Sequence, residues 1–265
     1  MTNPRFNLYL KAAIVPILLI FIWGLAVKIN LIPLSQAADP LTVLIKMGKL
    51  LIAPSFLLQL FLSLKRLVIG SILALILGAF IGLFLVISPL MNKLFSPTLN
   101  FLAGLPVVLW MPFWIMLFGL GETFKIGLAA MGAFFLVYTY STVTANATSR
   151  RYMELCQVYE KSKSEILFKV LLPESLSAIL TALRISLGIG WIVLFFVEYA
   201  TADLGKEGLG WFIANARAVG RVEEEFAGLI ILALTAFLLD NVILVVQKKL
   251  VYWKQTLEGI NERKD

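Results

Sequence analysis

Four ionisable side chains interrupt apolar stretches of this sequence, and their charges could act on a charged solute. They are Arg66, Arg184, Glu198 and Asp240. A charge at the centre of a bilayer costs at least ~2.5–3.5 kcal/mol, so each must face protein or water. Arg184 and Glu198 lie fourteen positions apart, about 21 Å along a straight helix, and cannot pair within one helix. The arginines suit an anionic solute and Glu198 opposes one, so the sign of the solute stays open. With two neutral neighbours they form the candidate pathway residues, which are Ser63, Arg66, Arg184, Trp191, Glu198 and Asp240.

Catalytic chemistry has few residues to use. The chain has no histidine and one cysteine, Cys156, so imidazole acid–base chemistry, the usual zinc sites and an internal disulfide framework are excluded. The nucleotide-binding motif Gly-x-x-x-x-Gly-Lys-Ser/Thr does not occur. The nearest match, GLGETFKIG at 119–127, lacks the terminal Gly-Lys-Ser/Thr. We expect a chain that is not an enzyme, with no catalytic residue, metal site or cofactor of its own.

The composition indicates a membrane bundle. Of 265 residues, 60% are hydrophobic and 15% charged, against about 45–50% and 25% in soluble domains. Apolar runs near the ~18–20 residues that cross a bilayer recur along the chain. We predict an all-α, polytopic single domain over 1–265. Its six expected spans are 12–29, 56–88, 99–120, 124–146, 174–201 and 226–247. Between the first two, Asp39 and Pro40 predict a short helix along the membrane surface.

The distribution of Lys and Arg predicts the orientation. With a cytoplasmic N-terminus, the inside segments hold 13 of the 23 basic residues and the outside segments seven, as the positive-inside rule requires. We expect a multi-pass membrane protein with both termini in the cytoplasm. The basic residues form no single stripe, so nucleic acid is not an expected partner. A cleaved signal over the first run is an alternative, disfavoured because Lys28 precedes the small-residue site.

The polar segment 150–173 then lies in the cytoplasm. Apolar residues recur at helical spacing on both sides of the stretch 160–165, which predicts a helix, a turn and a second helix. Ser162 and Glu165 fit a capping box that starts the second helix, and Pro173 is expected to end or bend it. The result is a short helix across the membrane face whose apolar side needs a cover. Periodicity alone leaves lipid headgroups and a protein partner as equal alternatives.

Two more features have structural and functional interpretations. Gly78 and Gly82, and likewise Gly188 and Gly190, are expected to let helices approach closely. Trp211 is expected on the external side of the membrane, with its neighbour Phe212 and the charged run 217–225. These residues are expected to form an external gate, a docking surface for a binding protein or an aromatic belt at the membrane interface.

Sequence order within the polar segment resembles the permease subunits of ATP-binding-cassette importers. Their signature reads Glu-Ala-Ala, three residues, Gly, nine residues, Ile-x-Leu-Pro, and this chain has Glu154-Leu155-Cys156, Glu160 and Val170-Leu171-Leu172-Pro173 at the same spacing. Glu160 replaces a glycine and loses its easy access to left-handed backbone angles. The resemblance assigns coupling to an ATPase to the following residues: Glu154, Leu155, Cys156, Tyr159, Glu160, Lys161, Ser162, Lys163 and Pro173. Tyr159 and Cys156 are the apolar side chains expected to insert, as knobs, into a groove of the ATPase.

Other segments resemble the nitrate, sulfonate, taurine and bicarbonate branch of these permeases. They are Ser63-Leu64-Lys65-Arg66 with Gly70, the segment from Leu105-Pro106 to Gly121, and Glu198 followed by Gly208-Leu209-Gly210.

The resemblance implies a type I importer fold and a permease that forms the solute pathway. Its implied location is the bacterial inner membrane. Its implied partners are a second permease copy, expected to be identical, two cytoplasmic ATPase subunits that bind ATP and magnesium, an external solute-binding protein and membrane lipid. The implied solute is a small anion or organic solute. Closure of the ATPases would pull the coupling segment inward and tilt the spans. An ion-coupled secondary transporter is the alternative, although such proteins usually show an internally repeated half.

Overall fold

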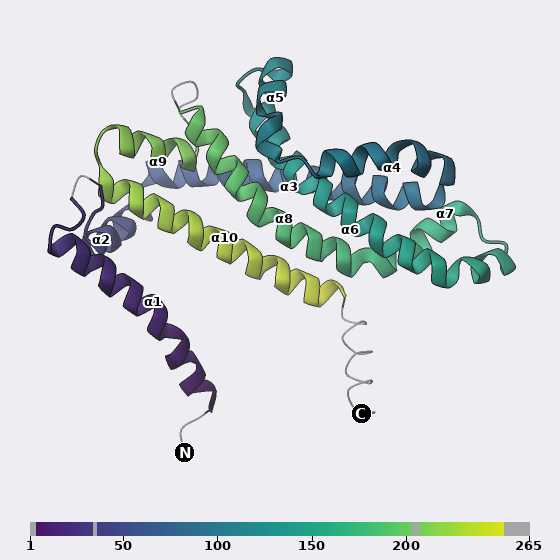
Figure 1. Cartoon of the computed structure of the whole chain (residues 1–265), viewed down its shortest axis with the longest axis horizontal. Coiled ribbons are helices and arrows are strands. Elements are labelled where there is room, and N and C mark those ends of the chain that lie inside the picture. Colours follow the sequence, from purple (N-terminus) through teal and green to yellow (C-terminus); the bar gives the residue numbers. More distant parts are fainter. Residues whose placement is uncertain (1–3, 34–35, 203–206, 252–265) are drawn as a thin grey trace.

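The computed structural model describes residues 4–33, 36–202 and 207–251, and every regular element within these ranges is helical. The elements in chain order are α1 (Pro4–Lys28), α2 (Pro40–Leu50), α3 (Pro54–Ile87), α4 (Pro89–Ala103), η1 (Val107–Trp110), α5 (Met111–Phe118), α6 (Glu122–Val158), α7 (Lys163–Glu165), η2 (Ile166–Leu171), α8 (Leu172–Ala200), α9 (Leu209–Ala218) and α10 (Val222–Leu250). The all-α prediction is confirmed. The bundle is elongated, with α9 and the α6–α7 turn at opposite ends of its long axis (Figure 1).

Helices α3, α6 and α8 form the centre of the bundle, and small residues let the first two approach closely. A Cβ atom added at Gly78 would lie 2.9 Å from the carbonyl oxygen of Phe134, and one at Gly82 would lie 2.7 Å from the Cβ of Ser141. Glycine is therefore required at both crossing points. Gly190 approaches Leu67 in the same way, whereas open space surrounds Gly188. The expectation of close packing is wrong at Gly188.

Local signals start α2 as predicted. The Asp39 carboxylate accepts hydrogen bonds from the backbone amides of Leu41 (3.0 Å) and Thr42 (3.4 Å), and Pro40 occupies the first turn, where its missing amide costs nothing. Lys46 forms an ion pair of 2.7 Å with Glu224 at the start of α10. These contacts fix α2 against α10.

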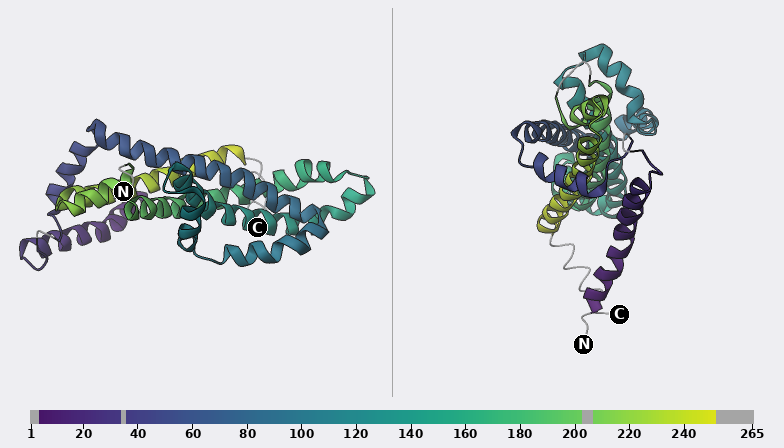
Figure 2. Two further views of the ribbon diagram at one scale, coloured as in Figure 1. Left: turned by 90° about the horizontal axis from the view of Figure 1, so that it is seen from above. Right: turned by 90° about the vertical axis from the view of Figure 1, so that its left-hand side faces the viewer.

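Four described helices are long and apolar enough to cross a membrane, or five if a bent pair counts as one span. They are α3, the first part of α6 (Glu122–Ser149), the continuous helical stretch Lys163–Ala200 and α10. The apolar stretch Ile14–Lys28 of α1 is shorter, and α1 diverges from the bundle in Figure 1 and in the right-hand view of Figure 2. The expected count of six spans is not confirmed.

The expected span 99–120 is not one continuous helix, because the chain breaks inside it. Helix α4 ends at Ala103, and the η1–α5 pair resumes at Val107 with a bend of 104° between the two. Pro106 explains the break, because it has no amide hydrogen to continue the helix and disfavours helical angles at Leu105. As a result, α5 stands out from the bundle (Figure 1).

The expected span 124–146 lies within the candidate membrane span Glu122–Ser149, but the helix itself extends further. Helix α6 continues to Val158 and holds 37 residues, about 55 Å at 1.5 Å per residue, against a hydrocarbon core of about 30 Å. The first half of the polar segment is thus an extension of α6. In the described structure it does not form the separate short helix expected across the membrane face.

Candidate functional site

A buried ion pair joins α3 to α8. The guanidinium of Arg66 donates from Nη1 to Glu198 Oε1 at 2.7 Å, and both side chains are 1% exposed. The hydroxyl of Ser63 also donates to Glu198, 2.8 Å from Oε1 and 2.7 Å from Oε2. Three of the six candidate pathway residues therefore meet in one place, although Glu198 lies far from the other two in the sequence.

The other edge of Arg66 holds the start of α6. Its Nε and Nη2 donate to the two carboxylate oxygens of Glu122 at 2.8 and 2.5 Å. Nη2 also lies 3.4 Å from the carboxylate of Glu207, and Nη1 donates to the Glu207 carbonyl oxygen at 3.3 Å. With three carboxylates around it, Arg66 has no edge left for an anionic solute.

Gly208 and the first turn of α9 complete this network through their backbone amides. The amide of Gly208 donates to Gln59 Oε1 (2.6 Å), that of Leu209 to Ser63 Oγ (2.8 Å) and that of Gly210 to Glu198 Oε2 (3.0 Å). Gly208 has a φ of 113°, and a Cβ there would lie 2.3 Å from Glu198 Cδ. Only glycine fits, because it tolerates positive φ and leaves room for the carboxylate.

Sequence reasoning missed Gln59, Glu122 and Glu207 in this network. Glu122 directly follows the glycine-containing stretch 118–121, at the start of an apolar run. This position was the available signal, since a carboxylate at a helix N-terminus is favoured by the helix dipole. Gln59 and Glu207 carried no comparable signal.

A second ion pair, separate from the first, links α8 to α10. Arg184 donates from Nε and Nη2 to the two oxygens of Asp240 at 2.5 and 2.7 Å. The exposed fractions of the two side chains are 36% and 40%. Trp191 is buried on the same helix pair, and its indole nitrogen donates to the carbonyl oxygen of Leu232 at 2.9 Å. Fourteen residues along α8 keep Arg184 away from the Glu198 network.

The end of α6 forms a tight turn that presents apolar side chains. Glu160 adopts a left-handed conformation with φ of 48°, and the Lys161 amide donates to the Cys156 carbonyl at 3.0 Å, which is the hydrogen bond of a Schellman motif. The glutamate thus takes the angle that a glycine would take more easily. Val158 and Tyr159 are exposed beside it.

The other coupling residues around this turn lie in several environments. Leu155, Glu160, Lys161, Ser162 and Lys163 are exposed. Cys156 is buried in the chain's own core, so the expectation that it forms a knob for a partner is wrong. The backbone of Glu154 belongs to α6, but its side chain lies outside the described part of the structure.

The capping box that starts the second helix is confirmed. The Glu165 amide donates to Ser162 Oγ, and the Ser162 amide donates to Glu165 Oε2, both at 3.3 Å. Lys169 also holds the Glu165 carboxylate, at 2.9 Å. The turn between Tyr159 and Ser162 is therefore fixed at both of its ends.

Pro173 does not end the second helix, which was one of the two expected outcomes. The chain forms a π-helix over Ile166–Leu171 and continues as α8, with the Leu172 amide donating to the Leu167 carbonyl. A proline clashes with the carbonyl four residues before it in an α-helix. The wider π turn next to it relieves this clash while the helix continues.

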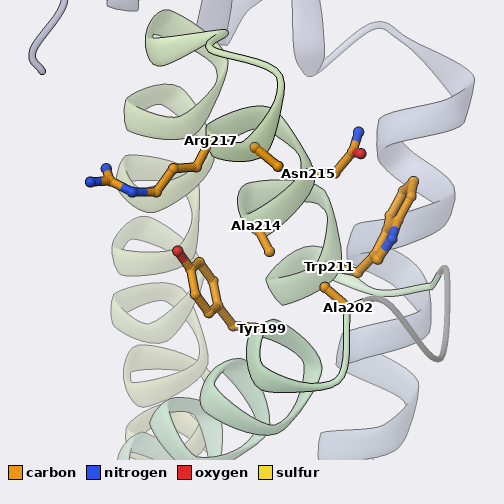
Figure 3. Close-up of a pocket in the computed structure, with 7 residues that line it drawn as sticks. Tyr199, Ala202, Trp211, Ala214, Asn215 and Arg217 are labelled. Atoms are coloured by element: carbon orange, nitrogen blue, oxygen red, sulfur yellow. The ribbon is translucent and has the colours of Figure 1, made fainter. Parts of the chain in front are cut away.

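A hollow of about 540 Å³ opens between the end of α8 and α9. Figure 3 shows Tyr199 of α8 and Trp211, Asn215 and Arg217 of α9 around it. Arg217 donates to Glu225 at 2.7 Å, and this hydrogen bond raises the pKa of the guanidinium. Unlike Trp211, Phe212 packs edge-on against Phe56 at a centroid distance of 4.9 Å, so it belongs to the core.

Among the described residues, no group of three or more Cys, Asp or Glu side chains is arranged to hold a metal ion.

Comparison with known proteins identifies the family. Residues 70–252 match the model of the "binding-protein-dependent transport system inner membrane component" family. The putative aliphatic sulfonates transport permease protein SsuC of Bacillus subtilis is 29% identical over 95% of this chain and 90% of its own length. The taurine transport system permease protein TauC of Escherichia coli is 29% identical over 72% of this chain and 68% of its own. The nitrate import permease protein NrtB of Synechocystis is 27% identical over 73% and 70%.

The fold has a solved counterpart. A chain of the MetNI methionine ABC transporter in an inward-facing conformation superposes with a TM-score of 0.61 at 17% identity, over 75% of this chain and 99% of that one. The likeness shows the type I importer permease fold. Because the family model covers more than half of the sequence, the chain belongs to the binding-protein-dependent transport system inner membrane components, and it is a multi-pass permease subunit of an ATP-binding-cassette importer.

Proposed function

We propose that this permease carries a small oxyanion across the membrane. The relatives named above are permeases for aliphatic sulfonates, taurine and nitrate, and another, CmpB of Synechococcus elongatus, is a bicarbonate permease at 26% identity. These solutes share one chemical feature, which is a compact group with several acceptor oxygens that carries negative charge. We therefore propose this oxyanion group as the feature that defines the solute class, without specifying the rest of the solute molecule.

The observation that carries the coupling proposal is the exposed apolar tip of the α6–α7 turn. Leu155, Val158 and Tyr159 are exposed there among charged residues. Exposed apolar side chains with a polar rim are typical of a protein-binding surface. A cytoplasmic ATPase subunit covers this tip in our proposal, with both termini of the permease on the same side. Two permease copies, two ATPases and an external solute-binding protein make up the importer.

The long helices can carry a movement of the tip to the other end of the bundle. Helix α6 runs from the turn to Glu122, and the helical stretch from Lys163 ends near Glu198. Both carboxylates bind Arg66. The α6–α8 hairpin is therefore closed by a capped turn at one end and by one guanidinium at the other. A displacement of the turn moves both helices together, since packed helices shift as rigid units.

The coupling proposal is tested by truncating the tip. We expect the double variant Val158→Ala, Tyr159→Ala to insert normally, to lose ATPase co-purification and to lose ATP-driven uptake in proteoliposomes. Val219→Ala is the control, because Val219 is also an apolar and exposed residue, at the opposite end of the bundle. Full ATPase co-purification and uptake by the tip variant would contradict the proposal.

A further inference from the structure

The ion pair between Arg184 and Asp240 lies deep within the membrane-spanning helices. Arg184 is about 18 Å from one end of α8 and about 24 Å from the other at 1.5 Å per residue. On the same scale, Asp240 is about 15 Å and 27 Å from the ends of α10. The half-thickness of the hydrocarbon core is about 15 Å. Both side chains therefore lie at least about 15 Å along the axis from the nearer end of their helix, within candidate membrane spans.

Burial distinguishes this pair from the one between Arg66 and Glu198. Arg66 and Glu198 are 1% exposed, so the chain itself shields them from lipid. Arg184 and Asp240 keep 36% and 40% of their side-chain surface uncovered. Ionised groups within membrane helices face the bundle interior or a water-filled cavity, because contact with lipid is too costly. The open side of this pair therefore faces water or protein in the membrane.

The surface next to the pair on α8 is hollowed and carries hydroxyl groups among apolar side chains. One turn before Arg184, Thr181 accepts a hydrogen bond from Gln247 of α10 at 2.9 Å. Thr181 also lines a hollow of about 400 Å³ towards α6, together with Thr139 and Tyr140. Thr139 in turn lines a neighbouring hollow of about 370 Å³ that reaches the helix break at 104–107. One turn after Arg184, Gly188 leaves open space.

The break between α4 and η1 also supports a solute pathway along this surface of α6 and α8. Non-helical backbone at membrane depth occurs where it is buried in protein or lines an aqueous cavity. In many transporters, broken helices mark the solute site. The break at Gly104–Val107 borders one of two neighbouring hollows that share Thr139. Arg184 lies one turn along α8 from Thr181, which lines the other hollow.

We propose that Arg184, oriented by Asp240, is the group inside the membrane that binds the oxyanion of the solute as it passes. The inference rests on the proposed function and names the residue that reads the negative charge. Asp240 engages Nε and Nη2 of Arg184, which leaves the Nη1 donors and one Nη2 hydrogen for acceptor oxygens. Because Asp240 offsets most of the positive charge, the anion binds weakly enough to leave again, as conduction requires.

Water access is the first test, measured in the complete importer in proteoliposomes. In a Cys156→Ser background, Gly188→Cys should react with a charged, membrane-impermeant thiosulfonate reagent. Leu238→Cys is the control, since Leu238 is exposed and lies two residues from Asp240, about 200° around the helix axis, so it should stay unreacted. Equal protection of both cysteines would overturn the proposal.

Uptake is the second test, with labelled taurine and nitrate as probes. We expect Arg184→Gln to lower uptake about tenfold or more at low solute concentration, the size of effect that losing a charge-assisted contact produces. Arg184→Lys should lose less, because it keeps the charge without the planar fork. Unchanged uptake by Arg184→Gln would overturn the proposal.

A third variant separates binding from structural pairing. In Arg184→Met, Asp240→Leu, apolar groups of similar volume replace both partners, which is often neutral for stability. Normal uptake by this double variant would show that the pair is structural and overturn the inference. Failure of the wild-type importer to take up any oxyanion would instead refute the proposed function, so the two failures are distinguishable.

Discussion

Replacing Arg66 by methionine should strongly destabilise the permease, and the reason is the burial of Glu198. Both side chains are 1% exposed, so solvent does not screen the pair. The variant leaves the Glu198 carboxylate with the Ser63 hydroxyl and the Gly210 amide as its remaining donors. Glu122 is 56% exposed and can be hydrated instead. Breaking one partner of a buried ion pair costs about 3–5 kcal/mol, and nearly all of that cost falls on Glu198.

A double-mutant cycle measures this cost. Glu198→Gln keeps a side chain of the same shape and leaves Arg66 bound to Glu122, so we expect a loss of about 1–2 kcal/mol. The double variant Arg66→Met, Glu198→Gln removes the uncompensated charge and should be more stable than the sum of the single losses by about 2 kcal/mol.

The assay is reversible unfolding of the purified permease by SDS in mixed micelles, followed by tryptophan fluorescence. Arg66→Lys is the control for charge alone, since it keeps the cation and loses the two-pronged contact with Glu122. Additivity within about 0.5 kcal/mol would show that the two residues are not coupled. That result would refute the conclusion that the network closes the α6–α8 hairpin.

Two further predictions concern backbone angles and use the same unfolding assay. Gly208→Ala should lose at least about 1–3 kcal/mol, because its φ of 113° strains any other residue and its Cβ would meet Glu198. Gly48→Ala is its control, as nothing lies within 4 Å of the added atom; a loss of equal size there would refute the steric reason. Glu160→Gly should gain about 1 kcal/mol, because it removes the cost of a left-handed glutamate with φ of 48°. Glu160→Ala keeps that angle and should gain nothing, so an equal gain by both variants would contradict the explanation.

The sequence could predict many of the residues of the candidate site, but not which of them contact one another. The sequence marks Ser63, Arg66 and Glu198 as costly or unusual in apolar runs. It did not indicate that they share one network, nor that Arg184 belongs to another. The two ion pairs join residues 132 and 56 positions apart. Their partners are set by how α3, α8 and α10 pack, which no pattern within one helix records.

The same division holds for the helices themselves. Asp39 at the start of α2 and the box formed by Ser162 and Glu165 were predictable because each acts on amides within three residues. The continuity of α6 from Glu122 to Val158 and the break after Ala103 were not predicted. An average of hydropathy along the chain registers how apolar a stretch is but not where a proline or a turn interrupts it.

By itself, the sequence determined that this protein is a helical membrane permease, where several helices begin, and which residues carry charge into the bilayer. It could do so because hydrophobic length, capping and motif spacing are properties of neighbouring residues. Only the tertiary structure decided that Arg66 is enclosed by carboxylates while Arg184 keeps an open side. The physical reason is that burial and pairing depend on helices that meet far apart in the chain, and the free energy of a charge depends on what surrounds it there.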